Sequence, residues 1–152
     1  MSDIKKLLDD PNFSRELIMD HYQYPHNHGL KEDDTYISKH MASESCIDDI
    51  TVQLKIEEGI IKDICFDGYA CTISTSSTSM MTDLLIGKTI DEANNIIDHY
   101  LKMVDNGEYD IDLLQEASVF KNIYKQANRI KCATIGWDAI KELLLESENK
   151  ND

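Results

Sequence analysis

The sequence has no long hydrophobic run, and this absence argues against a protein that crosses a membrane as a helix. Its longest apolar runs, such as Leu84–Ile86 and Leu143–Leu145, are short, whereas a helix needs roughly 20 apolar residues to span a bilayer. The N-terminal residues, Met1 to Asp10, are mostly polar or charged and lack the apolar stretch of a secretory signal. We therefore expect no membrane partner and a cytoplasmic location.

Basic residues are also scarce. The chain has 15 Lys and Arg against 29 Asp and Glu, so its formal net charge is −14. A nucleic-acid-binding protein needs a basic surface to meet the phosphates, and an anionic membrane surface makes the same demand. The composition therefore excludes nucleic acid as the expected partner, while proteins with basic faces remain compatible with it.

Internal repeats, low-complexity segments and linker-like changes of composition are absent as well. A chain of 152 residues is long enough to bury a hydrophobic core and short enough to form one unit. We therefore expect a single domain over residues 1–152, with polar, frayed ends at about 1–10 and 146–152.

The four cysteines contain no Cys-x-x-Cys pair, so the sequence gives little support to a structural zinc ribbon. In a chain without an export signal, cysteines are more often thiols than disulfides. Metal binding or thiol chemistry is therefore the expected use of these side chains.

Hydrophobic periodicity predicts three strands near the middle of the chain. Apolar and polar residues alternate from Ile50 to Ile56, and a second strand follows from Ile60 to Phe66. Glu57-Glu58-Gly59 between them is typical of a hairpin turn, and Thr35–Met41 supplies a third, weaker strand. Because a hairpin joins the two stronger strands, the sheet is expected to be short and antiparallel. A helix over about Phe13–Tyr24 precedes the strands.

Helical patterns dominate the second half of the chain. A helix after Cys71 is expected to stop at Gly87, and Thr89 with Glu92 makes a capping box for the next one. The last helix is predicted over about Thr134–Glu146. The expected fold class is therefore α+β, with a small three-stranded antiparallel sheet packed against several helices.

Three cysteines lie far apart in the sequence, yet each falls at a boundary between predicted elements. Cys46 precedes the strand at Ile50, Cys71 precedes a helix, and Cys132 is placed just before the last helix. Asp48 follows Cys46 by two residues in an extended segment, where alternate side chains point the same way. The spacing alone leaves two interpretations open: four ligands of one metal ion, or three unrelated buried thiols.

The charges of such a site favour nearby cations. Zn²⁺ with three thiolates and one carboxylate sums to −2, and Arg129 and Lys131 stand just before Cys132. An ordinary solvated helix face is the alternative explanation of these two residues. Cys71 is expected near the N-terminus of the following helix, where exposed N–H groups favour a thiolate.

Other reactive side chains are interpreted structurally. Cys65, inside the second strand, is predicted to be a structural or partly exposed thiol. His21 is expected to pack or to form hydrogen bonds, and His26 and His28 are expected on a surface loop. The run Ser74–Ser79 shows no accompanying His/Asp partner pattern, so close helix packing by small side chains is the preferred explanation.

Several motifs together resemble the SufU/IscU/NifU N-terminal family of iron–sulfur cluster assembly proteins. The resemblance covers roughly Arg15 to Leu145. It rests on Leu17–Tyr22 with Pro25, Asn27 and Gly29, on Cys46-x-Asp48, on Gly68–Ser74, and on Arg129–Thr134.

Two details resemble the SufU branch most closely. Lys131 stands where IscU-like members carry histidine, and the segment Asn106–Ala117 is similar to the SufU insertion. This resemblance implies a SufU/IscU-like fold and a zinc ion held by the matched residues, which are Cys46, Asp48, Cys71 and Cys132.

The resemblance also implies a function, namely zinc-dependent sulfur transfer. Cys46 would accept persulfide sulfur from a pyridoxal-phosphate-dependent cysteine desulfurase of the SufS type, and Arg129 would stabilise the released charge. A SufB-type assembly complex would receive the sulfur, which would make the chain a sulfurtransferase. The alternatives are a scaffold that builds a labile [2Fe–2S] cluster on the same three Cys and Asp, and a structural zinc module for protein contacts.

Two residues depart from the family pattern. Ile47 replaces the glycine between Cys46 and Asp48, and Ala70 replaces the glycine before Cys71. A β-branched residue is strained at positive φ, where glycine is not. Either the loop at Ile47 takes a different conformation, or glycine is not needed there for its φ.

Overall fold

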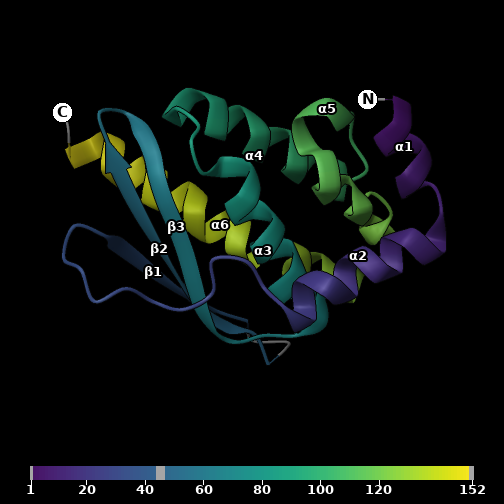
Figure 1. The fold of residues 1–152 in the computed structure, drawn as a ribbon, viewed down its shortest axis with the longest axis horizontal. Coiled ribbons are helices and arrows are strands. Elements are labelled where there is room, and N and C mark those ends of the chain that lie inside the picture. The colour runs from purple at the N-terminus through teal and green to yellow at the C-terminus, as the bar shows by residue number, and fades with distance from the viewer. Residues whose placement is uncertain (1, 44–46, 151–152) are drawn as a thin grey trace.

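The computed structural model describes residues 2–43 and 47–150, which form a three-stranded sheet with helices packed against it (Figure 1). The expected α+β class is therefore confirmed. In chain order the elements are α1 (Ser2–Leu8), α2 (Pro11–Gln23), β1 (Ile37–Ala42), β2 (Asp49–Glu57), β3 (Ile60–Tyr69), α3 (Thr72–Leu85), α4 (Ile90–Val104), α5 (Ile111–Leu114), the 3₁₀ helices η1 (Gln115–Phe120) and η2 (Ile123–Lys125), and α6 (Ala127–Lys150).

The sheet has the strand order β1-β2-β3, and both pairs of neighbours are antiparallel, as predicted. A two-residue turn joins β2 to β3, with φ of 54° at Glu58 and 75° at Gly59. Two consecutive positive φ values are the mark of a type I′ turn, whose twist matches that of the flanking strands. The predicted hairpin is therefore confirmed.

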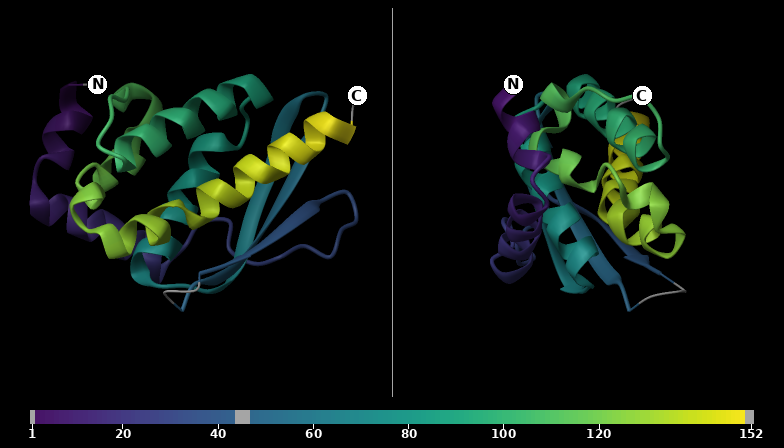
Figure 2. Two further views of the ribbon diagram at one scale, coloured as in Figure 1. Left: turned by 180° about the vertical axis from the view of Figure 1, so that it is seen from behind. Right: turned by 90° about the vertical axis from the view of Figure 1, so that its right-hand side faces the viewer.

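Helices α3 and α6 pack against the sheet, α3 beside β3 and α6 across β1 and β2 (Figure 2). Small side chains let the two helices approach closely. A Cβ added at Gly136 of α6 would lie 2.3 Å from the Oγ1 atom of Thr78 in α3, and the Ser77 hydroxyl donates to the carbonyl of Ala133 at 2.7 Å. This contact brings the first turns of α6, which carry Cys132, beside α3.

The core lies between the sheet and the helices and continues under α4. At its centre, Tyr100 stacks on Trp137 with ring centroids 3.8 Å apart and planes 4° apart. The capping box of Thr89 and Glu92 starts α4 as predicted. Among the described residues, no helix is both long and apolar enough to cross a membrane.

Several helix boundaries differ from the predicted ones. The last helix begins at Ala127 rather than near Thr134, so Cys132 lies inside its second turn and not before it. The sequence gives no cap signal at this start, and the contact between α6 and α3 stabilises the early turns instead. Helix α2 begins at Pro11 because Asp10 caps it. Residues 2–8, predicted to be frayed, form α1 and bury Leu8, and α6 continues beyond 146 to Lys150.

The end of β3 lies unusually close to the start of β2. Gly68 has a φ of 131°, and a Cβ there would lie 2.2 Å from the carbonyl oxygen of Asp49. In this register Gly68 pairs with Ile50 and Tyr69 pairs with Asp49. The pairing therefore brings the residue before β2 beside the residues that follow β3.

We predict that Gly68→Ala lowers the free energy of unfolding by about 2–4 kcal/mol, because the new Cβ meets both a strained φ and the backbone of β2. Urea unfolding followed by circular dichroism measures this loss. Gly59→Ala is the matched control, since Gly59 also has positive φ but nothing within 4 Å of its Cβ, and it should cost about 1 kcal/mol. Equal losses in the two variants would contradict the steric explanation.

Candidate metal centre

Asp48, Cys71 and Cys132 meet although they come from three separate parts of the chain. Asp48 precedes β2, Cys71 precedes α3, and Cys132 lies in α6. One ligand atom from each of them lies within 4.8 Å of the others. The structure therefore brings together all the predicted ligands that lie in its described range.

The fourth predicted ligand, Cys46, lies outside the described residues, as do its two preceding neighbours. Its part in the site stays a prediction. Asp48, whose side chain was expected to point the same way as that of Cys46, is described and faces the site.

The Asp48 carboxylate is buried, with 1% of the residue exposed. Its Oδ1 atom accepts the backbone N–H of Cys71 at 2.8 Å, and its Oδ2 atom accepts the hydroxyl of Ser74. The backbone carbonyl of Asp48 accepts the N–H of Ser43 at 2.9 Å. A buried carboxylate is stable only when it is hydrogen-bonded or paired, and these contacts hold Asp48 in one orientation.

Two opposing effects act on the pKa of Asp48. Burial works to raise it, but hydrogen bonds from the Ser74 hydroxyl, the Cys71 backbone and the thiols of Cys132 and Cys71 together outweigh burial. The pKa of the carboxyl therefore lies below its ordinary value, and Asp48 is an anion at neutral pH. An anionic oxygen facing two sulfur atoms is a donor set that attracts a cation.

Cys71 is the N-cap of α3, as its predicted place at a helix start implied. Its sulfur accepts the backbone N–H of Ser74 at 3.4 Å and also lies 3.4 Å from the Ser74 hydroxyl oxygen. Ser74 thus touches two predicted ligands, Asp48 and Cys71. This role of Ser74 was not predicted from the sequence, where the serine run indicated helix packing, although Ser74 follows Cys71 by one helical turn.

The chemistry of this donor set fits a metal ion. Two thiols and a carboxylate within 4.8 Å offer sulfur and oxygen, which suit tetrahedral Zn²⁺ when a fourth ligand completes the site. Cysteine sulfurs also hold iron–sulfur clusters. Cys71, Asp48 and Cys132 would therefore hold a zinc ion or a cluster, and the donor set by itself allows either.

The predicted cations lie on exposed positions of α6, near its start. Arg129 and Lys131 are both exposed, and Arg129 precedes Cys132 by three residues, which places the two on neighbouring turns of the helix. Lys131 lines a cavity of about 500 Å³, and Met41, Ser43 and Thr134 are among the other residues that line it.

Cys65 is separate from the site. It is buried in β3 with 1% exposure, and its thiol donates to the Oε1 atom of Gln53 at 3.1 Å. Burial raises the pKa of this thiol, which suits the structural role predicted for it.

The replacement at position 70 causes no backbone strain. Among the described residues other than glycine, positive φ occurs at Asn27, Glu58, Asn106 and Gln115, so Ala70 is not one of them. Glycine is therefore not needed at Ala70 for its φ. Ile47 is 72% exposed.

Comparison with known proteins gives a consistent family assignment. The family described as "NifU-like N terminal domain" matches residues 14–152. The iron–sulfur cluster assembly scaffold protein IscU of Streptococcus pyogenes serotype M1 is 39% identical over 134 residues, which cover 88% of this chain and 83% of that protein. The zinc-dependent sulfurtransferase SufU of Bacillus subtilis (strain 168) is 34% identical over 138 residues, which cover 90% and 92% of the two chains.

A solved structure has the same architecture. It is a candidate iron–sulfur cluster assembly scaffold protein for the SUF system (FiSufU) from thermophilic Fervidobacterium islandicum AW-1. It superimposes with a TM-score of 0.75 at 27% sequence identity and covers 85% of this chain and 94% of its own. The similarity thus extends from sequence to fold over most of both chains.

We predict that Ser74→Ala weakens Zn²⁺ binding by about 10–100-fold, because Asp48 and Cys71 lose the group that orients them. Competition with a chromophoric chelator measures the affinity. Ser76→Ala is the matched control, since the Ser76 hydroxyl donates to the carbonyl of Thr72 in its own helix. Unchanged affinity in Ser74→Ala, or an equal loss in Ser76→Ala, would argue against this role.

Proposed function

Because this chain belongs to the family of NifU-like N-terminal domains, which includes iron–sulfur cluster assembly proteins, we propose that it is a zinc-dependent sulfur-transfer protein. The zinc ligands would be Cys46, Asp48, Cys71 and Cys132. One observation carries the proposal: Asp48, Cys71 and Cys132, which are distant in sequence, offer ligand atoms within 4.8 Å of one another.

The metal would supply one chemical effect, since coordination removes the thiol proton and leaves a thiolate. The residues of the chain supply the rest. The Cys71 backbone and the Ser74 hydroxyl hold Asp48 by hydrogen bonds. Asp48 can therefore stay in place while Cys46 leaves the metal. Arg129 lies one helical turn before Cys132 and would stabilise negative charge released at the site.

Sulfur would reach the chain by persulfide transfer, which follows the chemistry of thiol–disulfide exchange. The Cys46 thiolate would attack the terminal sulfur of a persulfide on the partner enzyme, and a new S–S bond would form on Cys46. The S–S bond of the donor breaks at the same time, and the donor cysteine leaves as a thiolate. No external oxidant is required, because one S–S bond replaces another.

The proposed partners are those that the family resemblance implies. The donor would be a pyridoxal-phosphate-dependent cysteine desulfurase of the SufS type, which makes the persulfide, and the recipient would be a SufB-type assembly complex. Both belong to the proposal, as does the cytoplasmic location. The relative in Bacillus subtilis is named a zinc-dependent sulfurtransferase, which supports sulfur transfer.

A cluster scaffold is the second candidate function, and a specific observation favours it. The relatives from Streptococcus pyogenes and Thermotoga maritima are named scaffold proteins, and the same donors would hold a labile [2Fe–2S] cluster. Lys131 supports sulfur transfer instead, because an ammonium group has no lone pair to offer a metal unless it loses its proton.

We predict that Cys46→Ala abolishes the stimulation of a SufS-type desulfurase by this protein, because the sulfur acceptor is gone. Alanine production from cysteine measures the rate, and mass spectrometry of the chain detects the added sulfur. Cys65→Ala is the matched control, since Cys65 is a buried thiol outside the site. Full stimulation by Cys46→Ala would overturn sulfur transfer.

Anaerobic reconstitution with iron and sulfide tests the scaffold alternative. We predict that the zinc-loaded protein gains no visible absorption of a cluster, because zinc occupies the same ligands. A stable cluster absorption at one [2Fe–2S] per chain, lost in Cys71→Ala, would favour the scaffold. If metal removal unfolds the domain and Cys46→Ala stimulates the desulfurase normally, a structural zinc module would explain the site.

A further inference from the structure

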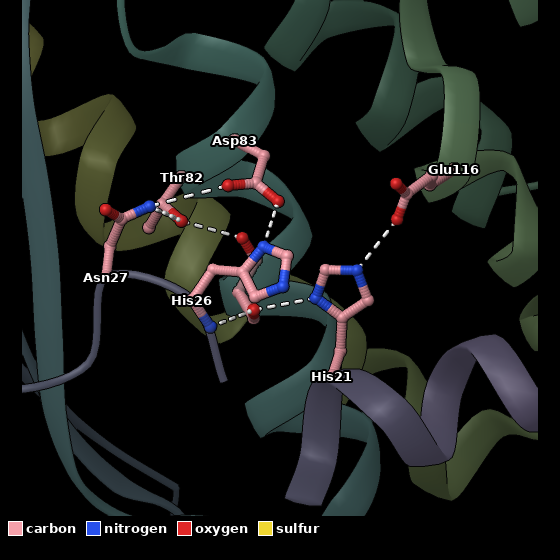
Figure 3. Close-up of polar contacts among 7 residues, drawn as sticks. His21, His26, Asn27, Thr82, Asp83 and Glu116 are labelled. Atoms are coloured by element: carbon pink, nitrogen blue, oxygen red, sulfur yellow. Dashed lines mark hydrogen bonds and ion pairs between the residues drawn. The ribbon is translucent and has the colours of Figure 1, made fainter. Parts of the chain in front are cut away.

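A second group of metal-ligating side chains lies at the other end of α3. His21 is near the end of α2, His26 is in the following loop, and Asp83 is near the end of α3. One ligand atom from each lies within 4.8 Å of the others, and the three side chains converge in Figure 3. Asp83 lies about 18 Å along the helix from Cys71, at 1.5 Å per residue, so this group is distinct from the cysteine site.

We propose that His21, His26 and Asp83 form a second metal site, which takes one divalent transition-metal ion such as Zn²⁺ or Fe²⁺. Two imidazole nitrogens and one carboxylate oxygen are a common donor set for both ions, and solvent completes the coordination. His21 is 3% exposed, whereas the side chains of His26 and Asp83 are 52% and 39% exposed. The site is therefore anchored in the protein and open to entering ions on one side.

Glu116 orients the buried ligand. Its Oε2 atom lies 2.7 Å from the Nε2 atom of His21 (Figure 3), and a carboxylate can only accept, so Nε2 carries the proton. In this tautomer the Nδ1 atom of His21 keeps the lone pair that a metal ion needs. Metal-binding histidines generally donate their other N–H to a carboxylate or carbonyl in this way, which fixes the tautomer.

The loop after α2 is held against α3 by four polar contacts. The backbone N–H of His26 donates to the Ser79 hydroxyl at 2.8 Å, and the His26 Nδ1 atom lies 2.5 Å from the Oδ2 atom of Asp83. The Asn27 amide donates to Thr82 at 2.8 Å and to Asp83 Oδ1 at 3.5 Å. His26 and Asp83 are thus already positioned together, so binding an ion would order little additional chain.

In this structure the Ser79 hydroxyl donates a hydrogen bond to the Nδ1 atom of His21, with Oγ 2.7 Å from Nδ1. A metal ion would exchange this hydrogen bond for a coordination bond, and Ser79 would keep the N–H of His26 as a donor. Ser79, His21 and Glu116 also form a hydroxyl–imidazole–carboxylate series of the kind used by nucleophilic enzymes. Ser79 has no exposed surface, however, so a substrate cannot reach it, and metal binding is the better use of the imidazole.

The test is a count of ions per chain. Equilibrium dialysis against Zn²⁺, and against Fe²⁺ under argon, followed by metal analysis, should give two ions per chain with at least one of these metals. His26→Gln and Asp83→Asn should each lower the count to one. His28→Gln is the matched control in the same loop, because His28 pairs with Asp67 at 3.1 Å and lies outside the group; it should keep two.

Cobalt separates the two sites by their spectra. Co²⁺ bound to thiolate sulfur gives intense near-ultraviolet charge-transfer bands, whereas Co²⁺ bound to nitrogen and oxygen gives only weak visible bands. His26→Gln should lose the weak component and keep the charge-transfer bands. Circular dichroism of the metal-free variants should match the unmodified protein.

One ion per chain in the unmodified protein with the charge-transfer bands present, or a second ion retained by both His26→Gln and Asp83→Asn, would overturn the proposal. Absence of the charge-transfer bands alone would contradict the cysteine site and the proposed function but leave this second site intact. The two failures are therefore distinguishable in one titration.

Discussion

The buried carboxylate of Asp48 at the N-terminus of α3 connects the sheet to the helical layer. A carboxylate with 1% exposure would be costly without partners, and it finds them in the Cys71 backbone and the Ser74 hydroxyl. Because Asp48 precedes β2 while Cys71 precedes α3, these hydrogen bonds fix one element against the other. Two ligands of the metal centre therefore share one support, and neither can move far without the other.

Three buried serine hydroxyl groups of helix α3 each have a different partner. Ser74 binds Asp48 at the metal centre, Ser77 binds the backbone of α6 at Ala133, and Ser79 binds the imidazole of His21. A serine-rich helix is otherwise an unusual core element, because every buried hydroxyl needs a hydrogen bond. Here those hydrogen bonds stabilise three parts of the fold: the metal centre, the contact between α3 and α6, and the loop after α2.

The two groups of ligands differ in chemical character. The first offers cysteine sulfur with one carboxylate, and the second offers imidazole with one carboxylate. Thiolates favour Zn²⁺ and iron–sulfur clusters, whereas imidazole and carboxylate suit a wider range of divalent ions. A protein that carries both would hold a sulfur-containing site near the start of α3 and a nitrogen- and oxygen-containing site near its end.

The sequence by itself determined the strands, the hairpin turn and the capping box at Thr89, because the signals for these are local. It also indicated that Asp48, Cys71 and Cys132 belong together, through motifs that resemble a family rather than through any calculable contact. The predicted start of α6 was wrong, because no capping residue marks the true start in the sequence. The contact of Ala133 with Ser77, which stabilises this part of the helix, is a tertiary contact.

Only the tertiary structure decided which hydroxyl groups serve which site. Ser79 and His21 are 58 residues apart, and His21 and Glu116 are 95 residues apart, so no local pattern joins them. Such contacts depend on how α2, α3 and η1 pack, which is a property of the whole core.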